Sequence, residues 1–310
     1  MQNPHYVAVD VSKVMLDVAL PSPWRTPNTP AGLKALTRKL DSFEHSHVVC
    51  EATGRYGRLL ARTMDEAGIP FSAVNPRQVR DFARATGQLA KTDTIDARAI
   101  LGFARAMQPG AMPQAPENQA RLVERVRRRR QLVDMLAVEK QRLSGLDDAE
   151  SLASIKAHLA FLEGQIATVD AQIAAEIASD AKLARRAMLL CSIPGIGAVT
   201  AAVLIAELPE LGQCDNKQIA ALAGVAPMNR DSGQWRGQAH IAGGRLSVRC
   251  ALYMATLPAI RFNPPIRDFY KHLRDHGKAP KLAITAAMRK LLIIANTIIR
   301  QDRPWTDNHA

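Results

Sequence analysis

Few cysteines and a shortage of acidic residues limit what this chain can be. Its four cysteines, Cys50, Cys191, Cys214 and Cys250, are far apart and form no C-x-x-C pair. This spacing argues against a structural zinc site and a disulfide framework, and it favours a reducing cytoplasm. The 29 Asp and Glu residues are outnumbered by 41 Lys and Arg residues, which gives a formal net charge of +12. Such an excess predicts a polyanionic partner, nucleic acid first and an anionic membrane second.

Several familiar signatures are also missing. The sequence contains no P-loop, H-E-x-x-H or G-x-G-x-x-G pattern. Because a strand begins almost at the first residue, we expect no signal peptide. The uncharged run Met188–Ala206 is interrupted by Pro194, Gly195 and Gly197. It therefore predicts two short helices around a turn and no membrane span.

The first 108 residues alternate between strand and helix patterns. We expect a β-hairpin over 6–20, strands over 48–51 and 71–74, and helices over 31–40, 58–67 and 76–86. The segment Pro21–Pro30 holds four prolines and is predicted to be a loop. This alternation indicates an α/β sheet with both faces covered, forming a domain over 1–108.

Four acids stand at informative places in this domain. Asp10 ends the run Tyr-Val-Ala-Val-Asp, Glu51 ends the second strand, and Asp93 and Asp96 share one face of a helix. Converging carboxylates repel one another unless cations neutralise them, and oxygen ligands select Mg²⁺ or Mn²⁺. Two such ions about 4 Å apart assist phosphodiester chemistry. The alternative is ordinary: Asp10 caps a turn at the end of its strand, and Asp93 and Asp96 complement a helix dipole.

The middle of the chain is purely helical. Residues 109–117 are rich in proline and predict a linker, and 118–180 predict a helical hairpin or an intermolecular coiled coil used for oligomerisation. A 3-4 alternation of apolar residues supports this prediction, at Leu152, Ile155, Leu159, Leu162, Ile166, Val169 and Ile173.

Two arginine groups are candidates for contact with nucleic-acid phosphates. Arg77, Arg80 and Arg84 form one stripe of the helix over 76–86. The second group is the run Arg127, Arg128, Arg129 and Arg130. The alternative for both groups is a solvated surface without a partner.

Residues 181–310 predict a mainly helical domain. Ile193–Gly197 resembles a helix-hairpin-helix turn, in which the amides of Gly195 and Gly197 would face a phosphate. It is otherwise a tight turn between core helices. The glycine-rich segment 224–245 contains Ser232, a candidate nucleophile or a simple turn former. Three arginines that could surround a phosphate near it are Arg230, Arg236 and Arg245.

These motifs, in this order, resemble the DEDD transposases of bacterial insertion sequences, the recombinases related to the Piv and MooV invertases. The resemblance rests on Val-Asp-Val-Ser-Lys, Glu-Ala-Thr-Gly and Lys-Thr-Asp-Thr-Ile-Asp-Ala, then on Ile-Pro-Gly-Ile-Gly and the Ser-Gly loop. It implies an RNase H-like (RuvC-like) first domain whose Asp10, Glu51, Asp93 and Asp96 hold Mg²⁺ or Mn²⁺. It also implies that Ser232 attacks DNA and forms a covalent phosphoserine.

The resemblance further implies partners. They are double-stranded donor and target DNA, a structured guide RNA encoded by the element, as in the "bridge" recombinases, and further copies of the chain in a dimer or tetramer.

Other functions stay open from the residues alone. One is a hydrolytic RuvC-type nuclease or junction resolvase that uses water. Another is a non-catalytic RNA-binding protein with a degenerate nuclease fold. A sugar-kinase-like ATPase would need a second phosphate loop, which the sequence lacks.

Overall fold

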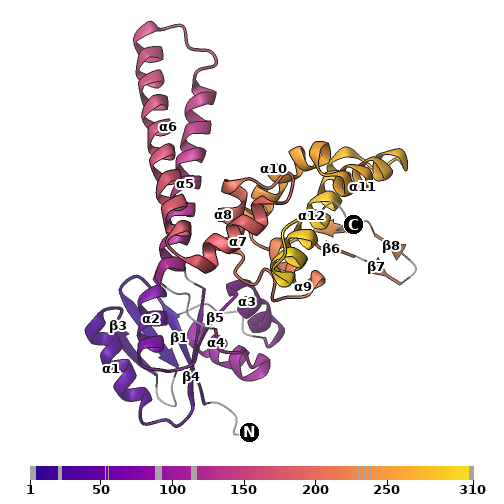
Figure 1. Cartoon of the computed structure of the whole chain (residues 1–310). Coiled ribbons are helices and arrows are strands. Elements are labelled where there is room, and N and C mark those ends of the chain that lie inside the picture. Colours follow the sequence, from indigo (N-terminus) through magenta and orange to yellow (C-terminus); the bar gives the residue numbers. More distant parts are fainter. Residues whose placement is uncertain are drawn as a thin grey trace. The chain divides into compact units, whose positions relative to one another are not determined.

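A computed structural model describes residues 5–19, 23–52, 54, 56–87, 93–112, 117–229, 231–233, 235–237 and 239–306. The chain divides into two compact units, Met1–Ala115 (unit 1) and Pro116–Ala310 (unit 2) (Figure 1). Each unit has hydrophobic clusters of its own.

Unit 1 is built on a mixed five-stranded sheet with the order β3-β2-β1-β4-β5. Its strands are β1 (His5–Val11), β2 (Met15–Ala19), β3 (Trp24–Pro27), β4 (Ser46–Glu51) and β5 (Phe71–Val74). β1 and β2 form the predicted antiparallel hairpin, and β1, β4 and β5 run parallel to one another. The prediction of an α/β sheet is confirmed.

The prediction of a loop over Pro21–Pro30 was wrong in its middle. Trp24–Pro27 forms β3, which pairs antiparallel with β2 at the edge of the sheet. An edge strand needs hydrogen bonds along one side only, so it tolerates prolines that would break a central strand. For this reason the proline content did not exclude a strand here.

Helices cover both faces of the sheet. The helices of unit 1 are α1 (Pro30–Leu40), α2 (Arg58–Glu66), α3 (Pro76–Ala85) and α4 (Asp93–Met107). Val7 and Val9 of β1 share a hydrophobic cluster with α1 and α2, whereas Tyr6 and Ala8 share one with α3 and α4. Because side chains alternate along a strand, even-numbered residues of β1 face α4.

The proline-rich segment after α4 begins as part of unit 1. The amide of Met112 donates to the carbonyl of Phe71 at 2.8 Å, and the Ser72 hydroxyl donates to the carbonyl of Gly110 at 2.7 Å. The first residues of the predicted linker therefore run along β5.

Unit 2 begins with a long helical hairpin of α5 (Glu117–Arg142) and α6 (Ala149–Ala178), which lie side by side (Figure 1). The hairpin shares one hydrophobic cluster with the helices that follow it, from Leu122 through Ile298. The structure therefore divides the chain once, near residue 116, whereas the sequence pattern suggested a second division near residue 180.

The rest of unit 2 consists of helices and a small strand-bearing segment. The helices are α7 (Ala181–Cys191), α8 (Ala198–Glu207), α9 (Asn216–Ala223), α10 (Leu246–Phe262), α11 (Pro264–Asp275) and α12 (Pro280–Gln301). The two helices expected within 188–206 are thus present. Among the described residues, α12 alone is long and apolar enough to cross a membrane, but half of its apolar window is buried inside the protein, as in a core helix.

Candidate active site

Asp10 and Glu51 lie at neighbouring strand ends. Val9 pairs with Cys50 in the parallel β1–β4 ladder, so the two acids follow this pair side by side. Asp10 shares the strand face of Tyr6 and Ala8, and Glu51 shares the face of Val49, which lies in the same cluster. Both acids are half-buried. The sheet therefore brings two of the four predicted acids together on the face covered by α4.

The pKa of the Cys50 thiol is raised by burial and by the charges of these two acids. Cys50 is buried, and burial is the largest cause that raises its pKa, to about 12, followed by the negative charges of Glu51 and Asp10. Both carboxylates are therefore near enough to disfavour the thiolate, although the Cys50 side chain packs on the opposite face of the sheet, in the cluster of Val48. Their oxygens and their mutual charge fit a hard divalent cation such as Mg²⁺.

Helix α4 carries the other two acids. Helical spacing places Asp96 on the stripe of Ile100 and Phe103, which are buried against the sheet face of Asp10 and Glu51. Asp93 is the first residue of α4, and its side chain lies outside the described part of the chain. Among the described side chains, no three His, Cys, Asp or Glu residues gather closely enough to hold a metal. Asp96 therefore faces the same side of the sheet as Asp10 and Glu51. The three carboxylates do not lie close enough together to hold a metal in this arrangement.

Ser232 lies at the tip of a nested β-hairpin within the glycine-rich segment. The segment forms β6 (Pro227–Met228), β7 (Asp231–Ser232), β8 (Trp235–Arg236) and β9 (His240–Ile241), in which β6 pairs with β9 and β7 with β8. Ser232 pairs with Trp235 and precedes Gly233, whose φ of 57° a glycine adopts without strain. Ser232 is exposed, and Figure 1 shows β7 and β8 reaching away from the helices of unit 2.

No described side chain hydrogen-bonds to the Ser232 hydroxyl. An unassisted serine hydroxyl is a weak nucleophile, so an attack by Ser232 would need a group that takes up its proton.

Of the three arginines predicted near Ser232, only Arg245 has a described side chain, and it is bound within the protein. Its guanidinium contacts both oxygens of Glu210 at 2.6 Å and donates to the carbonyl of Glu207 at 3.0 Å. Burial alone would raise the pKa of Glu210, but hydrogen bonds from Arg245 make the net direction downward. Arg230 lies outside the described residues, as does the side chain of Arg236.

The two arginine groups differ in how strongly their side chains are already bound within the protein. Arg77, Arg80 and Arg84 are exposed along α3 (Pro76–Ala85), and no described acid pairs with them. In the second group, Arg129 forms a two-point ion pair with Asp170 at 2.5 and 3.2 Å. The remaining contacts are weaker: Arg127 with Glu207 at 3.5 Å, Arg130 with Asp134 at 3.9 Å, and Arg128 with Gln131 at 3.4 Å.

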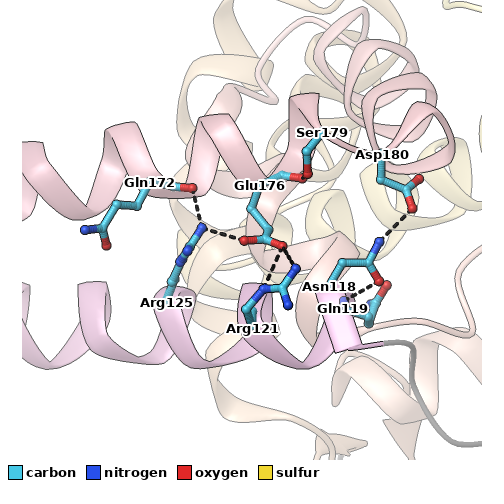
Figure 2. A network of polar contacts seen from close by, with 8 residues as sticks. All are labelled: Asn118, Gln119, Arg121, Arg125, Gln172, Glu176, Ser179 and Asp180. Carbon is cyan, nitrogen blue, oxygen red and sulfur yellow. Dashed lines mark hydrogen bonds and ion pairs between the residues drawn. The ribbon is translucent and has the colours of Figure 1, made fainter.

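Sequence reasoning missed a buried carboxylate in the hairpin. Figure 2 shows Glu176 of α6 held by Arg121 at 2.9 Å and by Arg125 at 2.6 Å, and Arg125 also donates to the carbonyl of Gln172 at 2.8 Å. A signal was available: the apolar 3-4 alternation ending at Ile173 continues to residue 176, where the sequence has an acid. An acid at a seam position predicts a partner on the facing helix.

The glycines of the Ile193–Gly197 turn have different surroundings. Gly195 has φ of 104°, and an added Cβ would lie 2.5 Å from the Cβ of Ala259. Gly197 is the N-cap of α8, and a Cβ there would meet nothing within 4 Å. Close packing therefore explains Gly195, while Gly197 borders open space at a helix N-terminus.

Comparisons with known proteins match two parts of the chain to models of transposase families. A family model for DEDD transposases of IS110 elements, described as "Transposase", matches residues 10–148. A second, described as "Transposase IS116/IS110/IS902 family", matches residues 187–271. The first match begins at Asp10, and the second includes the hairpin that carries Ser232.

Individual relatives support the same assignment. The chain is 28% identical over 317 aligned positions to the "Pilin gene-inverting protein" of Moraxella bovis, covering 97% of each chain. The protein of the same name from Moraxella lacunata matches to the same extent. An insertion element IS116 protein of Streptomyces clavuligerus is 31% identical over 123 residues, covering 39% of this chain and 31% of that one. The chain therefore belongs to the IS110 family of DEDD transposases, the transposases and recombinases of insertion sequences.

Proposed function

We propose that this transposase cuts and rejoins DNA through Ser232, assisted by a divalent metal held by Asp10, Glu51, Asp93 and Asp96. The observation that carries the proposal is the exposed serine at the tip of the β7–β8 hairpin, in a chain that also holds an acid pair at adjacent strand ends. Mixed strand directions and acids facing α4 are compatible with an RNase H-like (RuvC-like) unit 1.

Each group has a defined task in this proposal. The carboxylates hold Mg²⁺ or Mn²⁺, which when bound stabilises charge on the phosphate oxygens and favours loss of a nearby proton. The Ser232 oxygen attacks the phosphorus, forming a serine–phosphate ester and breaking the bond from phosphorus to one sugar oxygen. The serine gives up its proton, and the released sugar oxygen takes one up as a hydroxyl.

Rejoining reverses these steps with a different sugar hydroxyl. The energy of the phosphodiester is conserved in the phosphoserine, so no ATP is needed, in keeping with the lack of a P-loop. Arg236 and Arg230 are candidates for steadying the transferred phosphate. Arg245 is better explained as a residue that stabilises the base of the hairpin, because its guanidinium is already paired with Glu210.

The proposed partners follow from charge and resemblance. The net charge of +12 and the exposed arginines of α3 suit donor and target DNA. A structured guide RNA, assembly as a dimer or tetramer with sites shared between copies, and a cytoplasmic location belong to the same proposal.

The test compares Ser232→Ala with Ser154→Ala, a control at an exposed serine of α6. Both variants should melt like the wild type, because exposed substitutions change stability by less than about 0.5 kcal/mol. Ser232→Ala should lose strand exchange and the covalent protein–DNA species trapped by denaturation, whereas Ser154→Ala should keep both.

The alternatives give different results in this experiment. A hydrolytic nuclease would keep cleaving DNA with Ser232→Ala and would form no covalent species with either protein. A non-catalytic nucleic-acid-binding protein would show no cleavage or exchange at all, with or without Mg²⁺. Strand exchange by Ser232→Ala at the wild-type rate would exclude the serine mechanism.

A further inference from the structure

A pocket of about 600 Å³ lies within unit 2, apart from the residues proposed for catalysis. Strands β6 and β9 at the base of the Ser232 hairpin form one wall, and helices α11 and α12 form the others. Its lining includes Ile241, Phe269, Lys281, Arg289, Lys290 and Ile293. A volume in this range accommodates one small organic ligand.

The lining combines apolar and cationic groups. Phe269, Ile241 and Ile293 provide apolar surface, while Lys281, Arg289 and Lys290 provide positive charge. No acid is among the described lining residues, and none of these three cations forms an ion pair with a described acid. The ligand that complements such a pocket has a flat apolar part and an anionic part.

Two details favour an aromatic anion. The Nε of Arg289 is buried and has no hydrogen-bond acceptor among the described residues. Buried donors without acceptors are unfavourable, so a ligand oxygen that reaches this group gains a strong, charge-assisted hydrogen bond. The Nζ of Lys290 lies 5.1 Å from the centre of the Phe269 ring, so positive charge and an aromatic wall stand next to each other.

We propose that this pocket binds a single unpaired nucleotide of a nucleic-acid strand. Its base would pack against Phe269, and its phosphate would contact Arg289 and the two lysines. A nucleotide is favoured over other aromatic anions because the chain belongs to a DNA-recombining family and carries a large positive charge. Single-stranded nucleic acids bind through this combination of base stacking and cationic contacts.

The pocket lies at the base of the hairpin that carries Ser232, which suggests what a nucleotide bound there would do. Pro227 of β6 and His240 and Ile241 of β9 belong both to the pocket wall and to the base of the hairpin whose tip is Ser232. A nucleotide held there would anchor a strand that runs along the hairpin. The inference does not rely on the serine mechanism, and every measurement uses a Ser232→Ala chain so that no covalent bond can form.

The probe is a short single strand of DNA whose only base is 2-aminopurine among abasic sites, matched by a fully abasic strand. We expect stronger binding of the strand with the base and a change in its fluorescence. Phe269→Leu should weaken that binding about tenfold and remove the fluorescence change, while binding of the abasic strand should stay the same. Phe269→Tyr keeps the ring and should restore both signals.

A charge-matched pair of double variants isolates the pocket cations. Lys281→Ala/Lys290→Ala should weaken binding of the base-containing strand more than Lys271→Ala/Lys278→Ala, which removes the same charge from exposed positions outside the pocket lining. An RNA strand with the same single base shows whether the nucleotide comes from DNA or RNA. Equal losses from both double variants, or Phe269→Leu binding like the wild type, would overturn the proposal.

Discussion

Arg245 and Glu210 form a two-point ion pair with both nitrogen–oxygen distances at 2.6 Å. Arg245 stands at the end of the glycine-rich segment as the N-cap residue of α10, and Glu210 lies between α8 and α9. The pair therefore joins the base of the Ser232 hairpin to the helical core. Arg245, which the sequence alone suggested as a phosphate contact, therefore has a structural role in this arrangement.

Glu210→Gln should lower the free energy of unfolding by about 1 kcal/mol at neutral pH, because the pair is partly exposed. The folded-state pKa of Glu210 is lowered, so the pair stabilises the protein above the unfolded carboxyl pKa, about 4.3. That contribution is lost as the pH falls through the lower, folded-state value. Urea denaturation across this range measures it, with the exposed Asp275→Asn as control. Equal stability of Glu210→Gln and wild type at neutral pH would contradict the prediction.

Glu176→Gln should destabilise the α5–α6 hairpin by about 2 kcal/mol, because the buried carboxylate that pairs with two arginines loses its charge. Arg121→Ala should cost less, since Arg125 still holds the acid. A double-mutant cycle of Glu176 with Arg125, measured by urea denaturation, should give a coupling energy of at least about 0.5 kcal/mol. Additive effects of the two substitutions would show that the contact contributes nothing.

Arg128 and Arg129 are neighbours in sequence but should affect DNA binding differently. Arg128 has one weak contact, to Gln131 at 3.4 Å, whereas Arg129 is bound to Asp170. Arg128→Ala should reduce the slope of log K against log salt by about 1, with unchanged stability. Arg129→Ala should lower the melting temperature and leave that slope nearly unchanged. The opposite pattern would mean that Asp170 releases Arg129 when DNA binds.

These contrasts show which parts of the molecule the sequence could predict. The nearness of Asp10 and Glu51 was predictable, because acids at the ends of adjacent parallel strands meet at one edge of a sheet. The helical hairpin was predictable from its apolar alternation. The partners of Arg129 and Arg245 were not, since they lie 41 and 35 residues away in sequence. Strands of two residues, such as β7 and β8, are too short to show any periodicity.

Gly195 and Gly197 provide a matched pair for the turn between α7 and α8. Gly195→Ala should cost about 2–4 kcal/mol, because its φ of 104° disfavours a side chain and the new Cβ would meet Ala259. Gly197→Ala should cost less than about 1 kcal/mol, because space is open there. If the turn contacts a phosphate, Gly197→Ala should weaken DNA binding while lowering the melting temperature far less than Gly195→Ala does. Unchanged DNA affinity would leave the turn a packing element.

Mg²⁺ should raise the melting temperature of the full chain, because a cation that binds the folded state selectively stabilises it. Asp10→Asn and Glu51→Gln should each reduce this shift strongly, since both carboxylates lie beside Cys50 at one sheet edge. Glu44→Gln, at an exposed acid of the same unit, should keep the full shift. Differential scanning fluorimetry with and without a chelator measures all four proteins. One carboxylate alone does not bind Mg²⁺ tightly, so both Asp10 and Glu51 are needed for the site. A full Mg²⁺-induced rise of the melting temperature in Asp10→Asn would therefore show that the cation binds at another site.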